Sequence, residues 1–116
     1  MVENVKFKYL YRDAGNYKSW GITVFANLDG LLLYEVESRL RKAFFHREVF
    51  IASQIGIREV FLYTRDNPAE DDHCFHEFDS VELTTETPDD LYNRTIKDFV
   101  TQVEVESDKG WCTFIP

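Results

Sequence analysis

The first 26 residues constrain the fold most, because apolar and polar side chains alternate along them. From Val5 to Tyr11 every second residue is Val, Phe or Tyr, and two lysines lie between them. A side-chain period of two is typical of a strand buried on one face. Residues 18–26 form a second β-branched and aromatic run, and residues 13–16 supply Gly and Asn for a tight turn. The sequence therefore predicts an N-terminal hairpin whose lysines face outward.

Two later stretches have the period of an amphipathic helix. The first predicts a helix over residues 32–45, with acids toward its start and Arg and Lys toward its end. The second predicts a helix over residues 89–103, with Thr87 as N-cap and Pro88 at the first helical position. Asp108-Lys109-Gly110 ends this helical region.

The remaining segments complete an α+β fold. Residues 60–64 predict a short strand, and residues 75–84 predict an exposed or edge strand because charged residues interrupt both of its faces. Residues 49–57 fit neither period, and residues 111–115 suit either a last strand or a docked tail. We expect a single domain over residues 1–116, with a mostly antiparallel sheet of four to five strands and two helices packed on one face.

The composition indicates in which cellular compartment the protein is expected. The longest apolar runs are only a few residues, and charges occupy the N-terminal stretch where a signal peptide would be apolar. We therefore expect a cytoplasmic protein that does not enter a membrane. Cys74 and Cys112 are too few for a disulfide framework and lack C-x-x-C spacing, so free thiols are expected.

Charge is distributed unevenly along the chain. The formal net charge is −8, yet residues 1–65 hold ten Lys or Arg against seven acids. Residues 66–90, called the acidic segment below, hold ten acids and no Lys or Arg. Such asymmetry indicates either pairing with the basic first half or a surface for a partner. The acidic balance also makes nucleic acid an unlikely ligand, because phosphate contacts need clustered positive charge.

Residues 70–77, with the sequence EDDHCFHE, concentrate side chains that bind metals. A metal site here would use His73, His76, Glu77 and Asp72 to hold a divalent ion such as Zn²⁺. No H-E-x-x-H or paired C-x-x-C spacing supports it. A Cys74 nucleophile is disfavoured, because the surrounding acids raise a thiol pKa. Dinucleotide, P-loop and hydrolase-elbow motifs are also missing from the sequence, which favours a protein that is not an enzyme.

Two stretches, KFKYLYRDAGNYKSWG and EDDHCFHEFDSVELT, resemble a family of small, acidic, uncharacterised bacterial proteins. The resemblance covers about a third of the chain and carries no activity. It implies a bacterial cytosolic context and a self-contained domain. It also directs attention to a shared site in these stretches, with these candidate residues: Arg12, Asp13, Asn16, His73, His76 and Glu77.

The leading functional hypothesis is a non-enzymatic interaction or regulatory module that binds a protein partner with a basic surface. The expected partner-binding residues combine acids with aromatics: Asp71, Asp72, Glu77, Asp79, Glu82, Tyr11 and Trp20. One alternative is a metal-binding protein or metal-dependent enzyme that uses the EDDHCFHE segment. A further alternative is an acidic mimic of nucleic acid, and a homodimer is compatible with the aromatic content.

Overall fold

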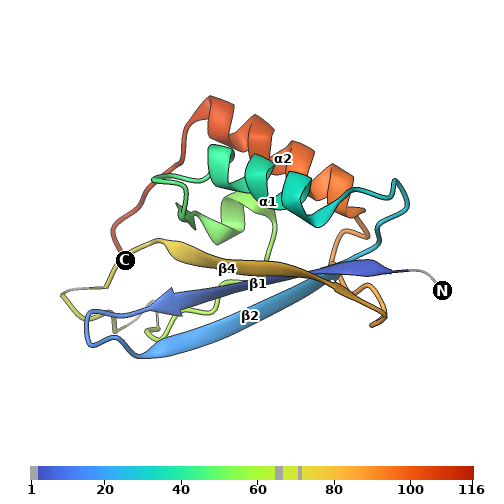
Figure 1. Cartoon of the computed structure of the whole chain (residues 1–116). Coiled ribbons are helices and arrows are strands. Elements are labelled where there is room, and N and C mark those ends of the chain that lie inside the picture. The colour runs from blue at the N-terminus through green and yellow to red at the C-terminus, as the bar shows by residue number, and fades with distance from the viewer. Residues whose placement is uncertain (1–2, 65–66, 71) are drawn as a thin grey trace.

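The protein, described by a computed structural model over residues 3–64, 67–70 and 72–116, is an antiparallel sheet with two helices on one face (Figure 1). The sheet order is β2-β1-β4-β3. The elements are β1 (Asn4–Arg12), β2 (Lys18–Phe25), α1 (Leu33–Ala43), β3 (Val49–Phe50), the 3₁₀ turn η1 (Ala52–Ile55), β4 (His76–Thr84) and α2 (Ile96–Lys109). This arrangement confirms the α+β prediction, with four strands in the described part of the chain.

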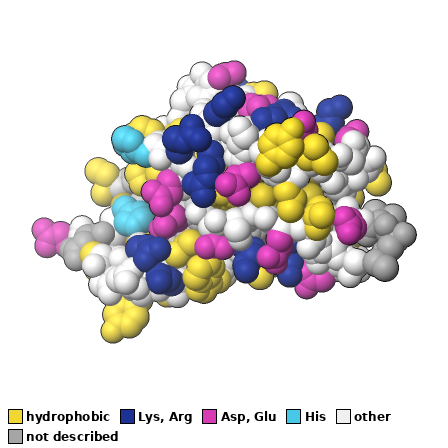
Figure 2. Space-filling view, in the orientation of Figure 1, with side chains coloured by type: hydrophobic (Ala, Val, Ile, Leu, Met, Phe, Trp, Pro, Cys, Tyr) yellow, Lys and Arg dark blue, Asp and Glu magenta, His cyan; other side chains and the backbone are white. Residues whose placement is uncertain are grey.

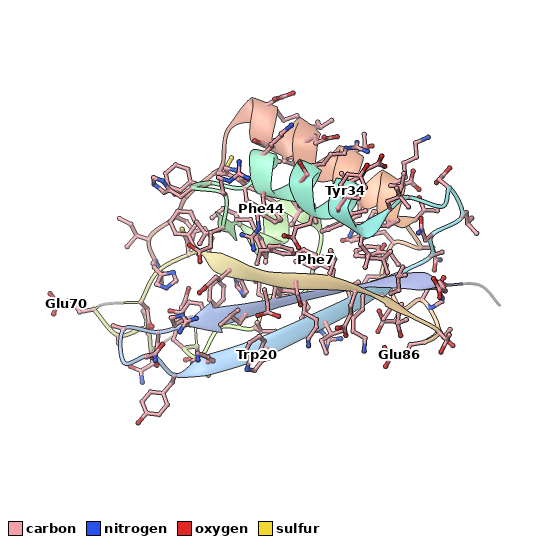
Figure 3. All side chains as sticks on the ribbon, viewed as in Figure 1. Phe7, Trp20, Tyr34, Phe44, Glu70 and Glu86 are labelled. Carbon is pink, nitrogen blue, oxygen red and sulfur yellow. The ribbon has the colours of Figure 1, made fainter. Side chains whose placement is uncertain are left out.

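The core lies between the sheet and the helices. The alternating residues of β1 turn one face toward the helices, and Val5, Phe7, Tyr9 and Tyr11 are at most 1% exposed. Phe7 is central to this layer, as Figure 3 shows, and its ring lies 5.1 Å from the ring of Phe99. The N-terminal hairpin prediction is therefore confirmed. Its outer face carries Lys6 and Lys8, opposite Val24 and Ile22 of β2.

Gly21 permits the ring of Tyr9 to reach across β2. Gly21 lies opposite Tyr9 in the β1–β2 register, and a Cβ built on it would meet the Tyr9 ring at 2.3 Å. The ring extends past this gap, and its hydroxyl donates a 2.6 Å hydrogen bond to the carbonyl oxygen of Arg58. The segment after η1 is thereby tied to the core side of β2.

The second helix starts later than its sequence pattern predicts. Thr95 is the N-cap of α2: its side chain accepts from the Asp98 N–H, and the Asp98 side chain accepts from the Thr95 N–H. Thr87 is not the cap, because Asp89 hydrogen-bonds instead with the backbone of Val24. Residues 89–94 thus precede the helix, which also continues past the predicted end at residue 103 to Lys109; the predicted break at Gly110 and the first helix are confirmed.

The strand predictions after residue 45 are only partly correct. Residues 60–64 form no strand, because the Val60 N–H donates to the imidazole Nε2 of His76 rather than to a neighbouring strand. The unassigned residues 49–57 contain β3 and η1. β4 lies between β1 and β3; it pairs with β3 at His76 and Glu77, and the Phe78 N–H donates to the Glu48 carbonyl oxygen just before β3.

The C-terminal residues form a docked tail rather than a strand. The Trp111 indole N–H donates to the Ala43 carbonyl oxygen at 3.1 Å, which fixes the start of the tail against α1. Cys74 is buried, Cys112 is exposed, and both are free thiols as expected. Within the described part of the chain, neither helix has the length and apolar character needed to cross a membrane.

Candidate functional site

Four of the residues singled out from sequence meet where β1 ends and β4 begins. Arg12, His73, His76 and Glu77 line a cavity of about 250 Å³, together with Val49 and Phe75. Arg12 is the last residue of β1, and Glu77 is the second residue of β4. Antiparallel pairing of these two strands brings segments separated by some sixty residues side by side. We call this cavity the Arg12–Glu77 cavity.

Both imidazoles at the cavity are held by backbone groups. His73 Nδ1 accepts from the Phe75 N–H at 3.2 Å, and its Nε2 lies 2.8 Å from the Arg12 carbonyl oxygen. These two contacts fix the proton of His73 on Nε2, because a carbonyl oxygen can only accept. The second imidazole, His76, accepts from the Val60 N–H through its Nε2 at 2.9 Å. Each ring thus uses its accepting nitrogen on a main-chain donor.

His76 is the most confined titratable group of the site. Its side chain is 1% exposed, and its Nδ1 has no hydrogen-bond partner among the described residues. Burial, and secondly the neighbouring His73, lower the pKa of His76 to about 4. The ring of Tyr11 contacts both imidazoles, with centroids 4.8 Å from His73 and 5.9 Å from His76. His76 is therefore neutral near pH 7.

The four residues predicted to bind a metal have other partners. Asp72 accepts from the Tyr11 hydroxyl at 3.0 Å and from the Ala69 N–H at 2.5 Å. Glu77 forms a bidentate pair with the Arg12 guanidinium, at 3.1 and 3.3 Å. Over the described residues, no group of three His, Cys, Asp or Glu side chains is arranged to hold a metal ion.

Much of the acidic segment pairs with cations of the same chain. Besides Glu77, the carboxylates of Glu82 and Glu86 share Lys6, at 3.7 and 2.5 Å. The hydrogen bond from Lys6 lowers the pKa of Glu86, and the same bond raises the pKa of Lys6. Asp90 is buried and pairs with Arg94. The complementarity expected from the uneven charge distribution is thus partly intramolecular.

Four described carboxylates of the acidic segment have no Lys or Arg of the described chain within ion-pair distance. These are Glu70, Asp72, Asp79 and Asp89. Asp79 is exposed and lies at an irregularity in the β1–β4 register, between the paired residues Phe78 and Ser80. Glu70 is exposed at the outer tip of the loop that precedes β4 (Figure 3). Asp71 lies outside the described residues.

The two aromatic residues predicted to contact a partner differ in exposure. Trp20 is 52% exposed on the face of the sheet turned away from the helices, where Figure 3 labels it below β2. Tyr11 is 0% exposed and belongs to the core, so it offers no surface to a partner. Figure 2 shows acidic and basic side chains interspersed with apolar ones along the sheet. Of the two, only Trp20 is placed for a surface contact.

Arg94, which sequence reasoning did not single out, bonds both to Asp90 and to the end of η1. Its guanidinium donates to both oxygens of Asp90 and to the carbonyl oxygens of Ile55 and Gly56, each at 2.8 to 2.9 Å. Its cation also lies 5.1 Å from the Phe99 ring centroid. The spacing of four between Asp90 and Arg94 was the available signal.

No family model, curated protein or solved structure matches this chain.

Proposed function

We propose that the protein is a non-enzymatic interaction module that binds a basic protein surface through the acidic segment. The supporting observation is the charge left after intramolecular pairing. Glu70, Asp72, Asp79 and Asp89 have no cation partner among the described residues, and Glu82 and Glu86 share a single lysine. Trp20 adds an exposed aromatic anchor on the outer face of the sheet.

The unpaired negative charge of the acidic segment acts mainly on the rate at which a basic partner associates. Exposed carboxylates attract a basic partner over about a Debye length, roughly 8 Å at physiological salt, and accelerate encounter. A carboxylate that is already paired with a lysine or arginine contributes less to this attraction, because the neighbouring cation offsets its charge. The unpaired Glu70 and Asp79 are therefore the residues expected to govern binding.

Salt-dependent capture tests this proposal. Immobilised protein is incubated with bacterial lysate at about 50 mM and about 500 mM salt, a range over which screening of exposed charges becomes strong. We expect a specific basic protein to be retained at low salt and released at high salt. The double variant Glu70→Gln, Asp79→Asn should retain markedly less of it.

The matched control is Asp29→Asn, Asp108→Asn, which removes the same charge from exposed positions outside the acidic segment. Equal loss of capture in both double variants would show a dependence on net charge alone and contradict the proposal. Absence of any protein retained specifically at low salt would also contradict it.

The metal-binding alternative retains one favourable observation, that His73, His76 and Glu77 line the same cavity. Binding would require the imidazoles to release the N–H groups of Phe75 and Val60. Elemental analysis and melting scans with Zn²⁺, Mn²⁺ and Ni²⁺ test it, because a ligand bound to the folded state raises the melting temperature. We expect no bound metal and no shift. A rise that disappears in His73→Gln would favour the alternative.

A further inference from the structure

β2 has an open edge between Lys18 and Ile22. One side of β2 pairs with β1, and the other side is occupied only at Val24. There the Asp89 N–H donates to the Val24 carbonyl oxygen at 3.0 Å, and the Val24 N–H donates to Asp89 Oδ1 at 2.7 Å. Backbone groups alternate in direction along an antiparallel strand. The N–H and C=O groups of Lys18, Trp20 and Ile22 therefore also point outward.

The open edge carries apolar side chains and little that would prevent pairing. Trp20 and Ile22 are 52% and 51% exposed on the outer face, and no described residue forms a hydrogen bond with their outward backbone groups. Proteins usually protect such an edge with proline, a bulge or a covering loop, because it is a template for another strand. Among the described residues, Asp89 bonds to this edge at Val24.

The space on the core side of the edge admits only small side chains. A cavity of about 170 Å³ separates residues 20–23 from residues 56–58, and residues 89–91 close one end of it. The segment at Arg58 lies on the core side, where it accepts the bond from Tyr9. A strand entering this space must therefore have little bulk on its core-facing side. β2 itself meets that condition, since Ser19 and Gly21 lie on its core-facing side.

We propose that the occupant of this edge is β2 of a second copy of the chain, added antiparallel so that Trp20 faces Trp20 of the partner subunit across a two-fold axis. In this register Ile22 faces Lys18 of the partner subunit, and all three outward-facing residues of each edge are paired. Ser19 then lies opposite Gly21 of the partner subunit, so the crowded side of the interface contains only small residues. The two outer faces lie on the same side of one continuous sheet.

Charge at the ends of the edge supports this register. Asp89 is bonded at Val24, one outward-facing residue beyond Ile22, and no described Lys or Arg neutralises it. Lys18 is exposed and has no acidic partner among the described residues. Outward-facing residues repeat about every 7 Å along a strand, a distance that a lysine side chain spans. Each end of the interface thus brings Lys18 of one copy to Asp89 of the other.

Sedimentation equilibrium of the purified chain tests the proposal without any other partner, so its result is independent of the proposed function. We expect a concentration-dependent mass approaching twice 13.7 kDa. At each end of the interface, Ile22→Lys places a lysine opposite Lys18 of the partner subunit. Like charges directly opposite each other destabilise a strand pair. This variant should raise the dimer dissociation constant by about tenfold or more. Ile22→Glu, which faces Lys18 of the partner subunit, should weaken the dimer much less.

Val105→Lys is the control, because Val105 is 44% exposed on α2, far along the chain from the edge. Amide hydrogen exchange adds a local readout: the Trp20 and Ile22 amides should be protected in the wild type and exchange freely in Ile22→Lys. A monomeric wild type at about 200 µM, well above a micromolar dissociation constant, would overturn the proposal. So would a dimer unaffected by Ile22→Lys, or one weakened equally by Val105→Lys.

Discussion

At the scale of single residues, His76 shows how one buried imidazole supports the packing of a neighbouring segment. Its Nε2 accepts from Val60 in place of a strand partner, and its ring packs against Phe61 with centroids 4.6 Å apart. A neutral imidazole can do both, but an imidazolium cannot accept a hydrogen bond through a protonated nitrogen. Protonation of His76 must therefore oppose the native packing of residues 60–63.

This conflict predicts a specific loss of stability in mild acid. The folded pKa of about 4 lies below the ordinary value of 6.5, so between these values the unfolded chain binds a proton that the folded chain does not. The free energy of unfolding then falls as the pH falls from 6.5 to 4, by roughly 3 kcal/mol from this group. Urea denaturation at a series of pH values measures the slope.

His76→Gln is the comparison variant, because a glutamine carbonyl can still accept from Val60. It should be less stable at pH 7 but should lose most of the slope between pH 6.5 and 4. The carboxylates of Glu86 and Asp90, whose pKa values are lowered, act at lower pH and should behave alike in both proteins. An unchanged slope in His76→Gln would show that another group causes the acid sensitivity.

At the scale of elements, α2 shows the limit of start signals in a sequence. Thr87-Pro88-Asp89-Asp90 and Thr95-Ile96-Lys97-Asp98 both offer a Thr followed by an acid three residues later. Only the second is a cap, because Asp89 bonds to the backbone of Val24 on β2, far away in the sequence, and Asp90 pairs with Arg94 four residues later. Local helix propensity does not include such tertiary contacts. The periodic patterns of α1, β1 and β2 predict these elements without them.

The cap at Thr95 should have a measurable energetic effect. Thr95→Ala removes the acceptor for the Asp98 N–H and leaves it unsatisfied at the helix start. We expect a loss of about 1 kcal/mol in the free energy of unfolding. Thr101→Ala, at an exposed position inside the same helix, should be neutral or slightly stabilising, because alanine has the higher helix propensity. Equal effects in chemical denaturation would contradict the assigned cap.

At the scale of the whole molecule, Arg94 joins three parts that are distant in sequence. It connects the segment before α2 to the end of η1, and its cation packs over Phe25 of β2 and Phe99 of α2. Its partner Asp90 is 6% exposed, so neither charge is well hydrated. Removing one member of such a pair leaves the other buried and uncompensated.

Arg94→Met should therefore destabilise the protein by about 3 to 5 kcal/mol in thermal or chemical denaturation. The control is Arg39→Met, which breaks the bidentate pair between Arg39 and Glu104 at 2.6 and 3.0 Å. Both of those side chains are more than a third exposed, so we expect a loss below about 1 kcal/mol. Comparable losses in the two variants would show that burial does not set the difference.

The candidate site was predictable to the extent that it depends on residue type. Arg12, His73, His76 and Glu77 were singled out and do share a cavity. Their bonding was not predictable, since the donors to the imidazoles come from the backbone of Val60 and Phe75, which no side-chain pattern reports. The same holds for the open edge of β2. It depends on which strands become neighbours and on the bonds between Asp89 and Val24, which limit the open part of the edge.

The central position of β1 in the sheet affects the order in which strands can pair during synthesis. β1 pairs with β2 across a short turn, but its other neighbour, β4, begins at His76. On the ribosome the hairpin can close early, while the second edge of β1 stays unpaired until some seventy residues have followed it. The nascent chain therefore exposes a row of unpaired backbone amides beside Phe7, Tyr9 and Tyr11. Translation speed through residues 26–84 should set how long that edge is open to misassembly with neighbouring chains.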